Sequence, residues 1–130
     1  MPYLLKIDEA SALGKDKFVN AKGNTECAEF VQQATGAPVT TKWTRGRLVK
    51  SFKSGELARG TAIATFDDKG NYPTDQLGRH AAIYLSHTND GILVLDQWNA
   101  QHEVLERMIR FHRPAGTKRS NDGDTFYVIE

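Results

Sequence analysis

The chain contains a single cysteine, Cys27, at the start of a stretch with helical periodicity. Cys27, Phe30, Val31 and Ala34 recur at spacings of three and four residues, which places them on one face of a helix. A thiol in the first turn of a helix lies at the positive end of the helix dipole, which favours the reactive thiolate. Cys27 is therefore a candidate nucleophile, although a lone cysteine in a helix is more often an inert part of a core.

The residues around Cys27 predict where this helix begins and ends. Asn24 or Thr25 is expected to act as the N-cap, and the acidic Glu26 suits the positive end of the dipole. Gly36, soon followed by Pro38, is typical of a helix end. Asn24 and Thr25 also flank the candidate nucleophile, so either could bind a substrate oxygen, but capping explains both residues equally well.

A thiol nucleophile needs an imidazole within hydrogen-bond reach, and the chain has four histidines. His80 opens the apolar run HAAIYL, so it is expected to project from the edge of a sheet. His87 lies in a predicted hairpin turn, His102 in a polar stretch, and His112 at the end of a predicted strand. His80 is the best-placed candidate for the general base; the alternative is an ordinary histidine at a strand end.

A third group is expected to hold the imidazole, as a carboxylate does in hydrolytic triads. Asp96 interrupts the apolar run ILVLDQW near its end, where an unpaired buried carboxylate would be costly. The Asn89-Asp90-Gly91 sequence predicts a tight hairpin turn, and counting back from it places His80 nearly opposite Asp96. Gln97 is the alternative orienting group if the side-chain alternation runs the other way. An exposed or backbone-bonded Asp96 is the other interpretation.

These candidates lie on a helix followed by strands, an order typical of an α+β fold. Residues 38 to 60 predict a short helix or an irregular segment, and residues 60 to 66 a buried strand. Residues 79 to 98 predict two strands of a hairpin. The stretch EVLERMIRFH favours a strand, but its leucine, glutamate and methionine residues are good helix formers, so a helix is the alternative. The stretch SNDGDTFYVIE predicts a turn followed by a strand. We expect N-terminal helices packed on an antiparallel sheet of about five strands.

Length and composition favour one globular domain. With 130 residues and 14.5 kDa, residues 1 to 130 are expected to fold as a single unit. The chain has 17 Lys and Arg residues against 16 Asp and Glu residues. This nearly balanced charge does not indicate a nucleic-acid partner. No apolar run approaches the roughly 20 residues of a membrane span, and the amino end lacks the layout of a signal peptide. We expect synthesis in the cytoplasm without a signal peptide, and no membrane insertion.

Two tryptophans are candidates for the walls of a substrate groove. Trp98 is two residues beyond Asp96 and is expected to share its face of the strand. Trp43 is the second candidate, and core packing is the alternative role for both. The histidines have no close histidine or cysteine partner at ligand spacing, so we expect no metal and no cofactor. A basic cluster predicts a solvated strand face: Arg107, Arg110, Arg113, Lys118 and Arg119.

The order of cysteine, buried strand, histidine, hairpin and aspartate resembles that of papain-like cell-wall amidases and peptidases, the NlpC/P60 and CHAP group. More closely, several stretches resemble the type VI secretion amidase effectors of the second family and their homologues acquired by arthropods. The resemblance is strong around the cysteine and the hairpin, and it is loose at the amino end. The stretches are GNTECAEFVQ, RGTAIATF, GRHAAIYL, VLDQW and SNDGDTFYVIE, which span the chain from Gly23 to Glu130.

This resemblance implies a small papain-like α+β domain that hydrolyses amide bonds in the peptides of bacterial peptidoglycan. It implies that Cys27 is the nucleophile, His80 the general base and acid, and Asp96 the orienting group. The D,D cross-link is the bond that the relatives favour. A cognate immunity protein and export by a secretion apparatus, for action in the periplasm or wall of target bacteria, are also implied.

Two alternatives stay open at this point. The first is a thiol hydrolase of the same fold that cuts another amide, such as the D-Glu–diaminopimelate bond of the peptide stem or a protein tail. The second is a non-catalytic binding domain in which Cys27 is merely packed. Antibacterial toxicity and cell-wall lysis are expected only if the protein is a peptidoglycan hydrolase.

Overall fold

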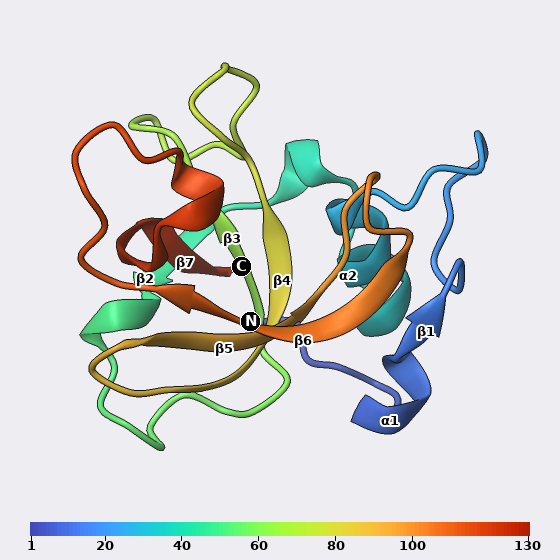
Figure 1. Cartoon of the computed structure of the whole chain (residues 1–130), viewed down its shortest axis with the longest axis horizontal. Coiled ribbons are helices and arrows are strands. Elements are labelled where there is room, and N and C mark those ends of the chain that lie inside the picture. The colour runs from blue at the N-terminus through green and yellow to red at the C-terminus, as the bar shows by residue number, and fades with distance from the viewer.

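The computed structural model describes all residues from 1 to 130. Seven strands form one sheet: β1 (Gly14–Lys15), β2 (Arg45–Leu48), β3 (Ala62–Thr65), β4 (Ala81–His87), β5 (Gly91–Asp96), β6 (Glu103–Arg110) and β7 (Phe126–Ile129). Their order across the sheet is β1-β6-β5-β4-β3-β7-β2, and every pair of neighbours is antiparallel. The longer strands β4, β5 and β6 meet in the middle of the molecule (Figure 1).

The principal helix is α2 (Cys27–Thr35), and α1 (Glu9–Ala12) is a single turn. Gly36 ends α2 as predicted, because it adopts a left-handed conformation with φ of 77° and donates its N–H to the carbonyl of Gln32. No helix is long and apolar enough to cross a membrane. Four short 3-10 turns complete the structure: η1 (Thr40–Lys42), η2 (Val49–Ser51), η3 (Arg119–Asn121) and η4 (Gly123–Thr125).

The α+β class predicted from the sequence is confirmed, but the prediction of about five strands is wrong, since the sheet has seven. The two additional strands, β1 and β2, form the two edges of the sheet, and β2 lies within residues 38 to 60. Their sequences GK and RGRL show no apolar alternation, so pairing with β6 and β7 makes them strands. The helix α2 packs on the sheet with three core residues, and the single-turn helix α1 adds only Ala12 to the same core.

The first eight residues of the stretch EVLERMIRFH form β6, which confirms the strand prediction. Its residues pair continuously with β5, from Gly91 opposite Arg110 to Asp96 opposite Leu105. These backbone hydrogen bonds outweigh the helix propensity of the leucine, glutamate and methionine residues, because propensity is a weak preference that tertiary pairing overrides.

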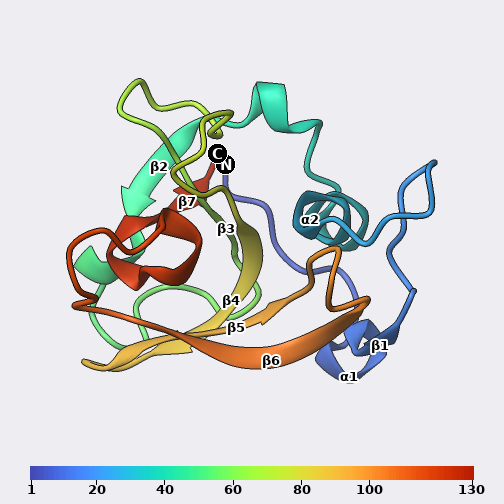
Figure 2. The same ribbon diagram turned by 45° about the horizontal axis from the view of Figure 1, so that its top comes forward.

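Apolar side chains fill both faces of the sheet. On one face, α2 packs Phe30, Val31 and Ala34 against the strands, and Figure 2 shows α2 nearly end-on in the angle between β4 and the β5–β6 pair. The strand residues on this face include Ala62, Ala64, Ala81, Ile83, Leu85 and Leu95. The opposite face carries a second cluster, formed by Val49, Ile63, Ala82, Tyr84, Ile92, Val94, Ile109, Phe111 and Phe126.

The β4–β5 hairpin is therefore buried on both sides, which accounts for its nearly continuous apolar sequence. Ile83 pairs with Leu95, and both side chains face α2. Since side chains alternate along a strand, Gln97 also falls on the α2 face, whereas Asp96 points to the other face. This alternation determines which of the two polar residues can reach His80.

Candidate active site

Cys27 is the first residue of α2, as the helical periodicity predicted, but the predicted N-caps are wrong. Glu26 is the N-cap residue, and its side chain makes no capping hydrogen bond. Thr25 is buried, and its hydroxyl donates to the carbonyl of Trp98 at 3.2 Å rather than bonding to its own helix. Asn24 is exposed and does not line the cavity next to Cys27. The start of the helix is thus held by a contact across the fold.

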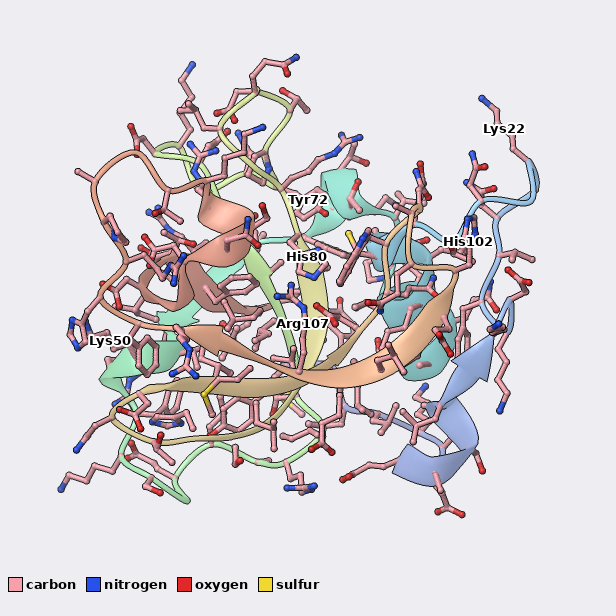
Figure 3. The ribbon with its side chains drawn as sticks, viewed as in Figure 1. Lys22, Lys50, Tyr72, His80, His102 and Arg107 are labelled. Atoms are coloured by element: carbon pink, nitrogen blue, oxygen red, sulfur yellow. The ribbon has the colours of Figure 1, made fainter.

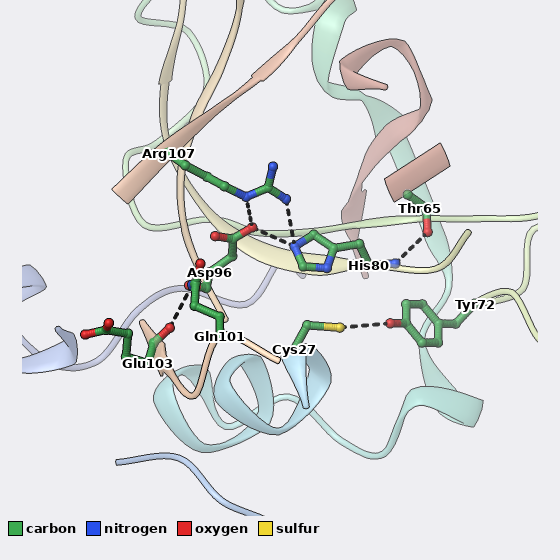
Figure 4. A network of polar contacts seen from close by, with 8 residues as sticks. All are labelled: Cys27, Thr65, Tyr72, His80, Asp96, Gln101, Glu103 and Arg107. Carbon is green, nitrogen blue, oxygen red and sulfur yellow. Dashed lines mark hydrogen bonds and ion pairs between the residues drawn. The ribbon is translucent and has the colours of Figure 1, made fainter. Parts of the chain in front are cut away.

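His80 lies immediately before β4, and Asp96 is the last residue of β5. His80 Nε2 and Asp96 Oδ2 are 2.6 Å apart, and both side chains are almost fully buried. The predicted hairpin does bring these two residues together (Figure 4), although its register shifts between Tyr84 and Ser86. The backbone N–H of His80 also donates to the Thr65 hydroxyl at 3.1 Å, which ties the residue to β3.

Gln97, the alternative orienting group, makes different contacts. Its side chain is fully buried on the α2 face, where Nε2 donates to the carbonyls of Phe18 and Glu26 at 2.8 Å each. No hydrogen bond joins Gln97 to His80. Gln97 therefore connects the end of β5 to the start of α2, and so fixes the position of the neighbouring Cys27.

Arg107 on β6 contacts the same dyad, which the sequence did not predict. Its Nε donates to Asp96 Oδ2 at 2.7 Å, its Nη2 lies 3.4 Å from His80 Nε2, and its guanidinium lies over the ring of Trp98. The predicted solvated basic face is therefore wrong for Arg107. Arg110, Arg113 and Lys118 are exposed as predicted, and Arg119 forms an ion pair with Asp75.

A cavity of about 220 Å³, here called the Cys27 cavity, brings the thiol and the imidazole to one surface. The Cys27 sulfur lies 3.5 Å from the Tyr72 hydroxyl. Figure 3 shows Tyr72, His80 and Arg107 close together in the middle of the molecule, and Figure 4 shows His80 between the Cys27 and Arg107 side chains. The cavity is lined by Glu26, Cys27, Ala28, Thr40, Tyr72, Arg79, His80, Trp98 and Asn99.

The surroundings of Cys27 and His80 shift their titration in opposite directions. Burial opposes ionisation of the Cys27 thiol, but a hydrogen bond to His80, its positive charge, the Tyr72 hydroxyl and the Ala81 N–H together lower the pKa of Cys27. Burial also opposes the charged form of His80, yet hydrogen bonds and charges of Asp96 and Cys27 raise the pKa of His80 to about 9. The pair therefore favours thiolate and imidazolium.

The comparisons with known proteins agree with this arrangement. The model of the family "Domesticated amidase effector 2" matches residues 7–129. The chain belongs to this family. It is 44% identical over 108 residues to domesticated amidase effector 2 of Ixodes scapularis, covering 81% of this chain and 70% of that protein. It is 34% identical over 140 aligned positions to the type VI secretion amidase effector 2 protein of Salmonella typhi, covering both chains completely.

A solved structure of type 6 secretion amidase effector 2 (Tae2) has a similar fold. Its TM-score is 0.79 at 31% sequence identity, and the match covers 98% of this chain and 94% of that one. The resemblance to the amidase effectors of the second family, drawn from the sequence, is therefore confirmed.

In this member of the domesticated amidase effector 2 family, the two predicted groove tryptophans have different positions. Trp98 is 37% exposed and lines the Cys27 cavity. Trp43 is buried, packs edge-on against Tyr72 with the ring centres 4.9 Å apart, and donates Nε1–H to the carbonyl of Pro38. Trp43 thus supports Tyr72 and does not line the Cys27 cavity.

None of the other three histidines lines the Cys27 cavity. His87 is buried, with one ring nitrogen on the Tyr84 hydroxyl and the other on the carbonyl of Phe52. His102 and His112 are exposed and have positive φ angles. No group of three or more His, Cys, Asp or Glu side chains is arranged to hold a metal ion.

Proposed function

We propose that this protein is a cysteine amidase that hydrolyses amide bonds in the peptides of bacterial peptidoglycan, and that residues 1 to 130 form one papain-like catalytic domain. The observation that carries the proposal is that Cys27 and His80 share a cavity, while His80 Nε2 lies 2.6 Å from Asp96. Membership of an amidase effector family supports amide hydrolysis as the reaction.

In the first step, the Cys27 thiolate attacks the carbonyl carbon of the scissile amide and forms a tetrahedral intermediate. The His80 imidazolium then donates a proton to the leaving amine, so the carbon–nitrogen bond breaks and an acyl-enzyme remains. The raised pKa of His80, about 9, keeps the ring protonated for this step at neutral pH.

The intermediate carries a negative oxygen that needs hydrogen-bond donors. The backbone N–H groups at the start of α2 have no partner within the helix and are the first candidates. The Tyr72 hydroxyl is the second, because burial and the nearby Cys27 sulfur raise the pKa of Tyr72 and keep the hydroxyl protonated. Asn24 and Thr25 are not needed, since Asn24 does not line the cavity and the Thr25 hydroxyl is bound to Trp98.

In the second step, neutral His80 removes a proton from water, which attacks the acyl carbon and releases the carboxylic acid and the Cys27 thiolate. Asp96 orients the ring throughout and stabilises its charged form, while Arg107 holds the Asp96 carboxylate from the other side.

We assign the D,D cross-link as the target bond, as the resemblance to the amidase effectors of the second family implies. We assign an antibacterial effector as the biological role, by analogy with the type VI secretion amidase effector 2 relative. Export by a secretion apparatus would bring the enzyme to the peptidoglycan of target cells. A cognate immunity protein that covers the Cys27 cavity would protect the producing cell.

Digestion of purified sacculi tests the proposal. Native protein should release muropeptides, and mass spectrometry of the products distinguishes cleavage of the D,D cross-link from cleavage of the D-Glu–diaminopimelate bond. Cys27→Ala should release none while keeping the native circular dichroism spectrum, since the smaller side chain fits at a helix start. Lysis by purified Cys27→Ala would refute the nucleophile assignment, and products cut only at D-Glu would refute the assigned bond.

A further inference from the structure

One residue, Arg79, lines three cavities around the Cys27–His80 pair. The first is the Cys27 cavity. The second, of about 280 Å³, shares Arg79, His80 and Trp98 with it and extends to Arg107, Ser120 and Asn121. The third, of about 260 Å³, shares Arg79 and Tyr72 with the first and extends along Trp43 and Asp67. We call the three cavities together the groove.

Arg79 is exposed and makes no hydrogen bond or ion pair within the chain. The other arginine of the groove, Arg107, is bound to Asp96. Arg110 and Arg113 are exposed as well, but neither lines the groove. Arg79 is thus the one guanidinium of the groove whose donors are free for a ligand.

Two acidic residues line the groove, Glu26 beside Cys27 in the first cavity and Asp67 in the third. Neither forms an ion pair with Arg79. Burial and the charges of Cys27 and Glu26 raise the pKa of Tyr72, and the charge of Arg79 opposes them. Arg79 therefore acts electrostatically on the residue that contacts the Cys27 sulfur.

The backbone that carries Arg79 is held by close packing at Gly78. Gly78 has a φ of 105°, and a Cβ there would lie 3.0 Å from the backbone nitrogens of Arg119 and Ser120. The N–H of Arg119 also donates to the carbonyl of Leu77 at 2.9 Å. This contact places the segment with Ser120 against the start of β4 and so builds one wall of the groove.

We infer that Arg79 binds a free carboxylate of the substrate beside the scissile amide, so that the enzyme prefers anionic stem peptides to amidated ones. This inference rests on the proposed function. A guanidinium binds a carboxylate through two parallel hydrogen bonds, and a carboxamide cannot replace that acceptor pair. Peptidoglycan stems offer such carboxylates on diaminopimelate, which flanks both candidate bonds, and on D-glutamate, which flanks only the D-Glu–diaminopimelate bond.

Synthetic cross-linked stem peptides test the inference. The two peptides of one pair differ only in a carboxylate or carboxamide on D-glutamate, and those of the other pair differ only in the same change on diaminopimelate. The two pairs therefore show which residue supplies the carboxylate that Arg79 binds. In the pair whose carboxylate Arg79 binds, the wild-type protein should cleave the carboxylate form with a kcat/KM about 10- to 100-fold higher than that of the carboxamide form. Arg79→Gln should remove that preference by slowing the carboxylate form alone, Arg79→Lys should keep part of it, and Arg113→Gln should behave as wild type.

Equal slowing of both forms by Arg79→Gln, or no slowing, would overturn the inference and leave the proposed function standing. A second measurement needs no peptidoglycan activity. The ratio of Cys27 alkylation rates with iodoacetate and the uncharged iodoacetamide should fall about three- to tenfold in Arg79→Gln. An unchanged ratio would overturn the inference, whereas a lowered ratio in a protein that cleaves no stem peptide would count against the proposed function.

Discussion

The guanidinium of Arg107 and the imidazole of His80 contact the same oxygen of Asp96, at 2.7 and 2.6 Å. Arg107 Nη2 also lies 3.4 Å from His80 Nε2. A cation so close to the ring disfavours a second positive charge on it, so Arg107 limits the stabilisation that Asp96 gives to the imidazolium.

We expect Arg107→Gln to lower kcat/KM about tenfold, because Asp96 loses a charged hydrogen bond that holds it. The basic limb of the pH profile should move upward from about 9, since the remaining Asp96 charge acts on His80 alone. A role in folding only would lower activity without moving this limb. Arg113→Gln is the matched control, because Arg113 is an exposed arginine without contacts to the dyad. A downward shift would contradict this account.

The pH dependence of Cys27 reactivity follows from the two pKa shifts. The lowered pKa of Cys27 means that the thiolate is present above that pKa and is lost as the pH falls through it. The raised pKa of His80 means that the imidazolium is present below about 9 and is lost as the pH rises through it. The ion pair therefore persists in the window between them.

We expect iodoacetamide to alkylate Cys27 at pH 6 to 7 faster than free cysteine, whose pKa is about 8.5. Mass spectrometry over a pH series measures the rates. His80→Ala should move the alkylation to higher pH, because burial alone raises the pKa of a thiol. Labelling that occurs only after denaturation would favour the alternative in which Cys27 is merely packed.

His80 and Asp96 should differ in the activity that their loss costs. His80→Ala should lower kcat about 10³-fold or more, because the general acid and base is removed. Asp96→Ala should cost less activity, since Asp96 orients the ring and does not transfer protons. Asp96→Ala should also lower the urea midpoint, because it leaves Arg107 without its buried partner. Equal or reversed activity losses would mean that the third group is misassigned.

Tyr72→Phe tests the proposed oxyanion donor. We expect kcat to fall about 10²-fold with KM nearly unchanged, because the lost hydrogen bond forms fully only in the transition state. Tyr127→Phe is the matched control, since Tyr127 is half-buried against Phe66 and does not line the Cys27 cavity. A higher KM at constant kcat would instead make Tyr72 a residue that binds the ground state.

Local patterns in the sequence were sufficient for the helix of Cys27 and for the β4–β5 hairpin. Helical periodicity and the Gly36 stop depend on neighbours within a few residues, and so does the Asn-Asp-Gly turn. The hairpin also brings His80 to Asp96, although its register shifts between Tyr84 and Ser86, so the turn alone does not set the pairing at that end. The N-cap was mispredicted because the Thr25 hydroxyl bonds to Trp98, a residue distant in the chain.

The contacts of Arg107 and Tyr72, and the position of Arg79 in the groove, lay outside what the sequence could predict. Arg107 reaches Asp96 because β6 pairs with β5 in one particular register. In the sequence, the charged residues near Arg107 instead predicted a solvated strand face. Tyr72 lies in a loop, and it contacts Cys27 with its hydroxyl while its ring packs against Trp43. Such contacts depend on how distant segments pack, which no local spacing records.

The sequence by itself determined the family, and it predicted both the candidate nucleophile and the histidine that shares its cavity, because these depend on residue types, short-range periodicity and one hairpin. The tertiary structure decided that Asp96 rather than Gln97 holds His80. Adjacent residues of a strand face opposite sides of a sheet, and only the packing of α2 decides which side belongs to the helix. Gln97 falls on the helix side and supports the start of α2, which leaves Asp96 to the imidazole.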